Sequence, residues 1–74
     1  MLDLRELQAL PMCRQLALTR IARGLTQQSI ARRAGIGEIY LSKIERGHRP
    51  LTPALERRIR AAIEIETVER AEPL

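Results

Sequence analysis

Apolar residues recur at helical spacing along most of the chain and divide it into short amphipathic segments. Three leucines spaced three apart predict a short helical turn over residues 3–10, which Pro11 would end. A second helix is expected over residues 12–23, with Gly24 well placed to stop it. The inward stripe of this second segment is expected to consist of Met12, Leu16, Ala17, Arg20 and Ile21.

Two further helices are predicted close together, over residues 27–34 and 38–46. Thr26 has a side-chain oxygen that can cap the first of them, and Gly35 can end it in the left-handed conformation. Gly37 is a tolerable N-cap for the second helix. The inward positions of the pair are expected to be Ile30, Ala31, Ala34, Ile36, Leu41 and Ile44.

The last clear helix is predicted to begin with Thr52 as its N-cap and Pro53 at its first helical position. Its inward stripe would be Leu55, Ile59, Ala62 and Ile63. The segment from residue 64 onward could be either a fraying helical end or an irregular tail. Phenylalanine and tryptophan are absent, so residues that favour β-strands are scarce. The pattern therefore predicts an all-α fold, a compact bundle of four or five helices.

Seventy-four residues make one small domain with a modest core. We expect an N-terminal extension with the short amphipathic turn over 1–11, a central domain over 12–66 and an acidic tail over 67–74. The formal net charge of +4 is unevenly distributed, because residues 12–60 carry eleven lysines or arginines against three glutamates. Such a basic segment attracts polyanions, with nucleic acid ahead of anionic membranes.

A single cysteine, Cys13, rules out an internal disulfide framework and fits a reducing compartment. The sequence shows no signal-peptide pattern at its start. It also contains no apolar run near the roughly 20 residues that span a bilayer. We therefore expect a cytoplasmic, nucleoid-associated protein that does not contact a membrane.

A helix, a short turn and a second helix at a steep angle form the helix-turn-helix arrangement, which presents its second helix to the DNA major groove. Residues 25–47 fit this geometry. Gly35 supplies the positive φ that the turn needs, and Ala31 is small enough for the two helices to approach closely. Tight helical hairpins also occur in proteins that never touch DNA, so the geometry alone leaves both possibilities open.

The stretch GLTQQSIARRAGIGEIYLSKIERGHRP resembles the helix-turn-helix domain of the phage repressor and Cro family, also called Xre-like regulators. The resemblance runs without a gap from Arg20 to Pro50 and continues more loosely over residues 52–63. It is carried mainly by Leu25, Thr26, Gln27, Ala31, Gly35, Ser42, Glu45 and Gly47. It implies a lambda-repressor-like domain that binds operator DNA, usually as a homodimer, often in phages, plasmids or toxin–antitoxin operons.

Carried over by position, the resemblance also implies roles for individual residues. The side chains that would face base edges are Glu38, Ile39, Ser42 and Lys43. Those that would contact phosphates are Thr26, Gln27, Arg46, His48 and Arg49. Arg20 and Glu45 match a partly buried ion pair of the family. Gly37 departs from the usual serine or threonine and so lacks one phosphate-contacting hydroxyl, and Tyr40 replaces a smaller residue.

Each role has a simpler alternative. Glu38 could only be a first-turn acid that suits the helix dipole, and Ile39 could belong to the edge of the core. Arg20 and Glu45 could be an ordinary surface pair worth under about 1 kcal/mol. Several arginines are better interpreted as solvated helix faces than as specific contacts, namely Arg32, Arg33, Arg57, Arg58 and Arg60.

Chemistry other than binding finds little support. His48 and Cys13 have no partners at the spacing of metal ligands. The sequence contains no nucleophile–base–acid set and no phosphate-cradling glycine loop, so we expect no enzyme, no metal, no cofactor and no small-molecule substrate. Proteins that bind single-stranded RNA stack its bases on aromatic side chains, and Tyr40 is the only aromatic residue here. Binding of RNA is therefore disfavoured.

The sequence therefore predicts a sequence-specific, double-stranded DNA-binding transcriptional regulator. We expect a Cro/C1-type repressor that binds a palindromic operator as a homodimer, with helix 38–46 in the major groove. The competing hypothesis is a protein-interaction module, such as an antitoxin that uses the same fold to bind a toxin or another protein partner. In that case Ile39, Tyr40 and the terminal apolar residues would form the exposed contact surface.

Overall fold

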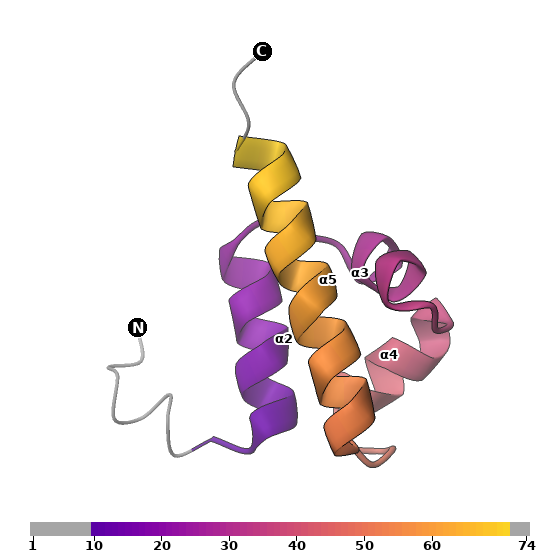
Figure 1. Ribbon diagram of the computed structural model, residues 1–74. Helices are drawn as coiled ribbons and strands as arrows, with labels where there is room; N and C mark the ends of the chain where they lie inside the picture. The colour runs from indigo at the N-terminus through magenta and orange to yellow at the C-terminus, as the bar shows by residue number, and fades with distance from the viewer. Residues whose placement is uncertain (1–9, 72–74) are drawn as a thin grey trace.

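The computed structural model describes residues 10–71, which form four α-helices (Figure 1). The helices are α2 (Met12–Ala22), α3 (Gln27–Ala34), α4 (Glu38–Glu45) and α5 (Pro53–Ala71). The predicted all-α fold is confirmed. The short helical turn expected over residues 3–10 lies, apart from Leu10, outside the described residues, as does the end of the expected acidic tail.

The helix starts follow from the capping residues that the sequence supplies. The Thr26 hydroxyl accepts a hydrogen bond from the Ser29 amide at 3.1 Å, which caps α3. The Thr52 hydroxyl accepts one from the Leu55 amide at 3.2 Å and caps α5 in the same way. Both predicted N-caps are therefore confirmed. At the other end of α3, Gly35 adopts the left-handed conformation with φ of 74°.

Helix ends differ from the predictions by small amounts, except in α5. Helices α2 and α4 each end one residue earlier than expected, at Ala22 and Glu45. Helix α5 continues through residue 66 to Ala71 without a break, so the segment from residue 64 to 71 is helical and not irregular. With 19 residues, α5 is the longest of the described helices.

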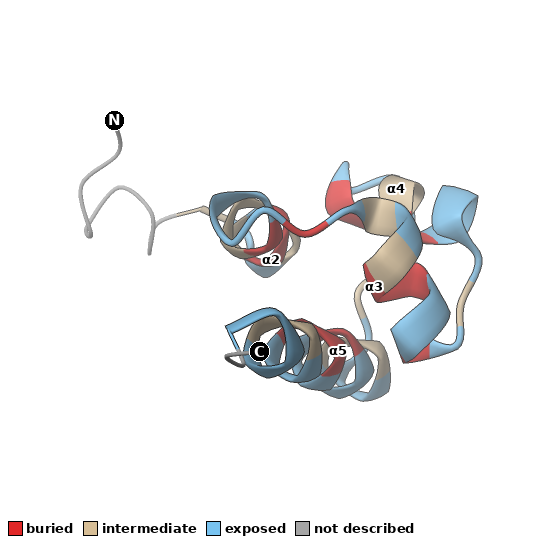
Figure 2. Ribbon diagram, turned by 90° about the horizontal axis from the view of Figure 1, so that it is seen from above, coloured by how far each residue is buried: buried red, intermediate tan, exposed pale blue. Residues whose placement is uncertain are grey.

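Helix α5 packs against both α2 and α3, and α2 also contacts α4 directly (Figure 2). The buried sides of the helices face one another around a single core (Figure 2). The largest fully buried side chains are Ile30 of α3, Leu41 and Ile44 of α4, and Ile59 of α5. These four residues belong to one core cluster, and Ile36, Leu51 and Leu55 cover the margin of the core.

The inward face of α2 is narrower than the sequence pattern indicated. Leu16, Ala17 and Arg20 are buried, but Ile21 is 57% exposed and Met12 also lies at the surface. The expectation that Ile21 faces the core is wrong because of helix geometry. Five residues separate it from Leu16, which places it about 140° around the helix from that buried side chain.

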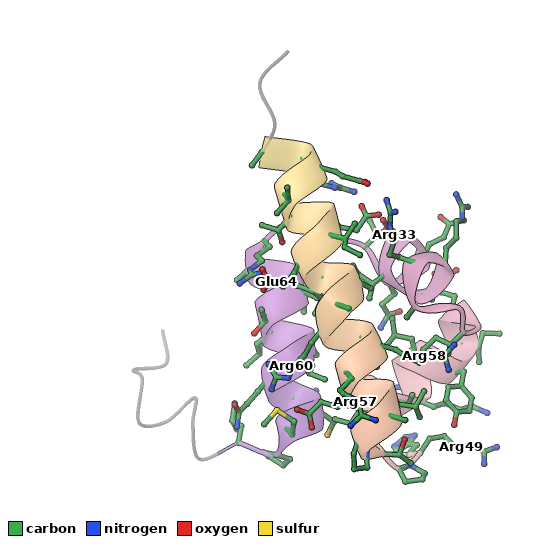
Figure 3. The ribbon with its side chains drawn as sticks, in the orientation of Figure 1. Arg33, Arg49, Arg57, Arg58, Arg60 and Glu64 are labelled. Atoms are coloured by element: carbon green, nitrogen blue, oxygen red, sulfur yellow. The ribbon has the colours of Figure 1, made fainter. Side chains whose placement is uncertain are left out.

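The expected solvated arginines include two that instead bind across the interface between α3 and α5. Arg33 of α3 forms ion pairs with Glu66, at 3.1 Å, and with Glu69 of α5. Arg58 of α5 reaches toward the end of α3 (Figure 3), where its Nε donates to the Ala34 carbonyl at 2.9 Å and its Nη2 to the Gly35 carbonyl at 3.1 Å. Arg58 thus satisfies carbonyl groups that the end of α3 leaves without helical partners.

Two of the other arginines expected on solvated faces do remain at the surface. Arg57 is exposed, and Arg60 forms an exposed pair with Glu56 at 2.9 Å, one turn away on the same helix. The position of Arg58 along the helix could have shown that this arginine, unlike Arg57 and Arg60, contacts α3. It directly precedes the buried Ile59 and lies four residues before the buried Ala62, so it borders the stripe that packs on α3.

Glu66 of α5 lies where three polar or charged side chains act on its carboxyl group. A hydrogen bond from the Ser29 side chain lowers the pKa of Glu66, although desolvation acts in the opposite direction. The hydrogen bond and positive charge of Arg33 and the charge of Arg70 lower it further. Glu66 is therefore ionised at neutral pH and holds the first turn of α3 against the C-terminal half of α5.

Candidate nucleic-acid interface

The turn between α3 and α4 is fixed from both sides. After Gly35 ends α3, the Ile36 amide donates to the Ala31 carbonyl at 2.9 Å, and the Ile36 side chain packs against the core. Gly37 then begins α4 as an N-cap without a side-chain bond, and its carbonyl accepts from the Leu41 amide at 3.0 Å. Arg58 binds the same turn from outside the core. The direction of α4 relative to α3 is therefore well determined.

Helix α4 divides its residues between the core and the surface. Leu41, Ile44 and Glu45 are buried. The side chains that leave the core are Glu38 and Ile39, which are exposed, and Ser42 and Lys43, which are half-buried. Spacings of one, four and five residues place these four on one continuous face of the helix. This is the face that the resemblance to the repressor family assigns to base contacts.

Ile39 is the most exposed large apolar side chain of the described residues, at 73%. The alternative that it belongs to the edge of the core is therefore wrong. Tyr40, the neighbouring residue, is also exposed. Helix α4 thus presents an isoleucine and a tyrosine to solvent beside Glu38, Ser42 and Lys43, which gives the face both polar and apolar elements.

The first turn of α3 places two of the expected phosphate contacts beside this helix. Thr26 uses its hydroxyl to cap α3, while Gln27 is half-buried and donates from Nε2 to Glu45 Oε1 at 3.0 Å. The bond leaves Gln27 with a second amide hydrogen and its carbonyl oxygen. Sequence reasoning missed this bond, because nothing in the spacing of residues 27 and 45 indicates that they meet.

The remaining expected phosphate contacts follow the end of α4. The His48 amide donates to the Lys43 carbonyl at 2.8 Å, which folds residues 46–48 back onto the helix end. The Arg46 side chain lies along α4, with Nε donating to the Ser42 carbonyl at 3.3 Å. Arg49 extends away from the ribbon (Figure 3), and both it and His48 are exposed.

Behind this surface, Arg20 and Glu45 form the ion pair that the resemblance implies. The guanidinium donates from Nε to Glu45 Oε2 at 2.8 Å and from Nη2 to Oε1 at 2.9 Å, and both residues are buried. Arg20 Nη1 also donates to the Leu25 carbonyl at 2.6 Å. The alternative of an ordinary surface pair is therefore wrong. One buried guanidinium joins α2, the segment before α3 and the end of α4.

The comparison with known families agrees with this geometry. A family model described as helix-turn-helix matches residues 16–69, which is most of the chain. The chain therefore belongs to the Xre/Cro-like helix-turn-helix family, whose fold is that of DNA-binding transcription regulators and is generally not enzymatic. No curated protein and no solved structure gave a significant match.

Residues 10–71 show neither a membrane-spanning helix nor a metal-ligand cluster. No helix in this part of the chain combines the length and apolar character needed to cross a bilayer. Across the same residues, no three side chains of histidine, cysteine, aspartate or glutamate gather as a set of metal ligands.

The buried pair yields a stability prediction. Replacement Glu45→Gln would leave the Arg20 guanidinium buried without a counter-charge, and removing one partner of such a pair costs about 3 kcal/mol or more. Glu56→Gln is the matched control, because it makes the same chemical change in the exposed pair with Arg60 and should cost under about 1 kcal/mol. Urea unfolding followed by circular dichroism measures both. Equal losses would contradict the structural role given to Glu45.

Proposed function

We propose that this protein is a transcriptional repressor that binds a palindromic operator as a homodimer, with α4 in the major groove of each half-site. The observation that supports the proposal most is the face of Glu38, Ile39, Ser42 and Lys43, which a rigidly held helix leaves outside the core. A groove-reading helix needs this combination of fixed direction and free side chains.

The chemistry of that face suits base edges. Lys43 is a donor for guanine O6 and N7, Glu38 can accept a hydrogen bond from cytosine N4, and Ile39 can pack on a thymine methyl group. Ser42 has a hydroxyl that both donates and accepts. The exposure of Ile39 supports its part in this assignment, because a contact with DNA would bury apolar surface that the free protein leaves in water.

Phosphate contacts are proposed on both sides of this face. Thr26 and Gln27 lie at the N-terminus of α3, where backbone amides and the helix dipole favour an anion. Arg46, His48 and Arg49 follow the end of α4 and would lie along the duplex backbone. Glu45 holds the side-chain amide of Gln27 in one orientation. Gln27 would therefore already be positioned before it contacts a phosphate.

The mode of regulation follows from dimeric binding. Two copies would read half-sites about one helical turn apart, and occupation of that site would block a promoter. We propose that the protein acts in this way in the cytoplasm, on nucleoid DNA, in a phage or plasmid operon of the Cro/C1 type. Its activity would then be controlled by its own concentration or by a protein partner.

Selection from random DNA duplexes of about 30 base pairs, enough for two half-sites, tests the proposal directly. We expect sequencing to show an enriched inverted repeat with half-sites near one helical turn apart. Enrichment of a single half-site would remove the homodimer from the proposal while keeping sequence-specific binding. An absence of any enriched sequence would contradict the proposed function.

Two substitutions separate base contacts from phosphate contacts. Lys43→Ala should reduce discrimination at one operator position by about 1–3 kcal/mol, because a base-edge contact is lost. Arg49→Ala, the control, should weaken binding to all sequences evenly, because phosphates carry no sequence information. Titration of both variants with operator and random duplexes measures the difference. Equal losses of Lys43→Ala on both duplexes would remove Lys43 from the base contacts.

The second candidate is a protein-interaction module such as an antitoxin, which the exposure of Ile39 and Tyr40 favours. Salt dependence distinguishes the two functions. A groove binder with six or more phosphate contacts should lose roughly a thousandfold in affinity between 50 and 200 mM salt, measured on the selected DNA. An apolar protein interface should change little over the same range. Salt-insensitive binding of a protein partner, with no specific DNA, would favour the second function.

A further inference from the structure

Helix α5 has an exposed apolar face that packs against nothing within the described residues. Ala54, Ala61, Ile65 and Val68 are exposed, with Ile65 at 43% and Val68 at 64%. The steps of seven, four and three residues between them keep all four on one side of the helix. The buried residues of α5 lie on the side that faces α2 and α3 (Figure 2). We call Ala54, Ala61, Ile65 and Val68 the outer face of α5.

The outer face is bordered by opposite charges along one edge. Arg57 and Glu64 are two helical turns apart and lie on the same edge of α5. Arg57 is exposed and makes no hydrogen bond or ion pair within residues 10–71. Glu64 pairs at 2.8 Å with Arg23, the residue that follows α2, but its side chain remains 65% exposed and open to a second cation. A shallow groove lined by Glu64, Ile65, Val68 and Glu69 covers the C-terminal part of the face.

We propose that the outer face of α5 binds a second copy of this chain, with the two α5 helices antiparallel and crossing at Ala61. The inference deepens the proposed function, because it names the surface through which the homodimer forms. The spacing of the face supports the crossing point. Ala54 and Val68 each lie seven residues from Ala61, so the valine of one copy would pack over the small alanine of the other.

The charges support the same arrangement. The twofold axis would pass through the crossing at Ala61. It would place the residue four positions before Ala61 in one copy at nearly the same height as the residue three positions after Ala61 in the other copy. Arg57 is four residues before Ala61 and Glu64 is three residues after it. Since both lie on the same edge of the helix, each Arg57 would meet Glu64 of the second copy, and the pair would form twice. The match of charge and spacing is what identifies the occupant as a second copy.

The two edges of α5 explain how such a dimer would present its DNA-binding helices. The edge with Glu64 contacts the C-terminal end of α2 through Arg23, whereas the opposite edge contacts α3 through Arg58 and Glu66. The twofold axis would place the same edge of both α5 helices on the same side of the dimer. In Figure 1 it corresponds to a half-turn about a horizontal line in front of α5, which leaves α2 on the left and α3 with α4 on the right. Both helix-turn-helix units would then lie on one side, as two half-sites of one duplex require.

Sedimentation equilibrium of the full chain tests the interface. Ala61→Glu should raise the dimer dissociation constant at least about tenfold, because two carboxylates would be buried where the helices cross. Ile21→Glu is the matched control, since it places the same charge on an exposed apolar position of α2 outside the outer face. It should leave the constant within about twofold of the original. Circular dichroism melting should show both variants folded, because both positions are at the surface.

A charge exchange supplies a second readout that a general loss of folding would not produce. Arg57→Glu should weaken the dimer about threefold or more, because two like-charged contacts would replace two ion pairs. Combining it with Glu64→Arg reverses both charges and should return the dissociation constant to within about twofold of the original. A double variant as weak as Arg57→Glu alone would overturn the proposed pairing.

The outcomes separate this inference from the proposed function. If neither Ala61→Glu nor Ile21→Glu changed the dimer dissociation constant, the outer face would not be the interface. The proposed binding to an inverted-repeat operator would be unaffected by that result. A chain that is monomeric at every concentration tested would overturn the inference as well. Loss of the dimer in Ala61→Glu without any enriched DNA sequence would support the interface and contradict only the proposed operator binding.

Discussion

The buried ion pair between Arg20 and Glu45 is the interaction on which the arrangement of the other helices depends. Glu45 is the last residue of α4, and Arg20 also binds the Leu25 carbonyl just before α3. Both ends of the helix-turn-helix unit are thereby tied to α2 through one guanidinium. A small domain has few core residues with which to fix such an angle, and hydrogen bonds to a buried charge supply direction that apolar contacts lack.

Other arginines are also bound within the chain, and two of them, Arg33 and Arg58, join α3 of the helix-turn-helix unit to α5. Arg23, Arg33, Arg58 and Arg60 are engaged with carboxylates or carbonyls of the same chain. Within residues 10–71, the basic side chains without such partners include Lys43 and Arg49, which belong to the proposed DNA surface. Fewer cationic side chains are therefore available to a polyanion than the eleven lysines and arginines of residues 12–60 suggest.

Most of the fold was predictable from local signals, because capping and turn residues act within a few positions along the chain. Thr26, Gly35 and Thr52 with Pro53 each mark a helix end, and helical spacing identified Ile30, Leu41, Ile44 and Ile59 as core residues. The missed features join distant parts of the sequence. Arg58 meets Gly35, Gln27 meets Glu45, and Arg33 meets Glu66, and no local pattern specifies such pairs before the helices are packed.

The exposed apolar residues of α4 and those of α5 have different surroundings, and each group therefore has a different physical meaning. On α4, Ile39 lies next to Tyr40 and among polar side chains, where a single apolar contact can add discrimination to a polar surface. Ile65 and Val68 are aligned with Ala54 and Ala61 along α5, and an aligned stripe can pack against another helix. A small domain gains stability when such a stripe is covered, and association makes that gain dependent on protein concentration. For a regulator of this kind, the concentration that sets the fraction of dimer would also set the fraction of operator occupied.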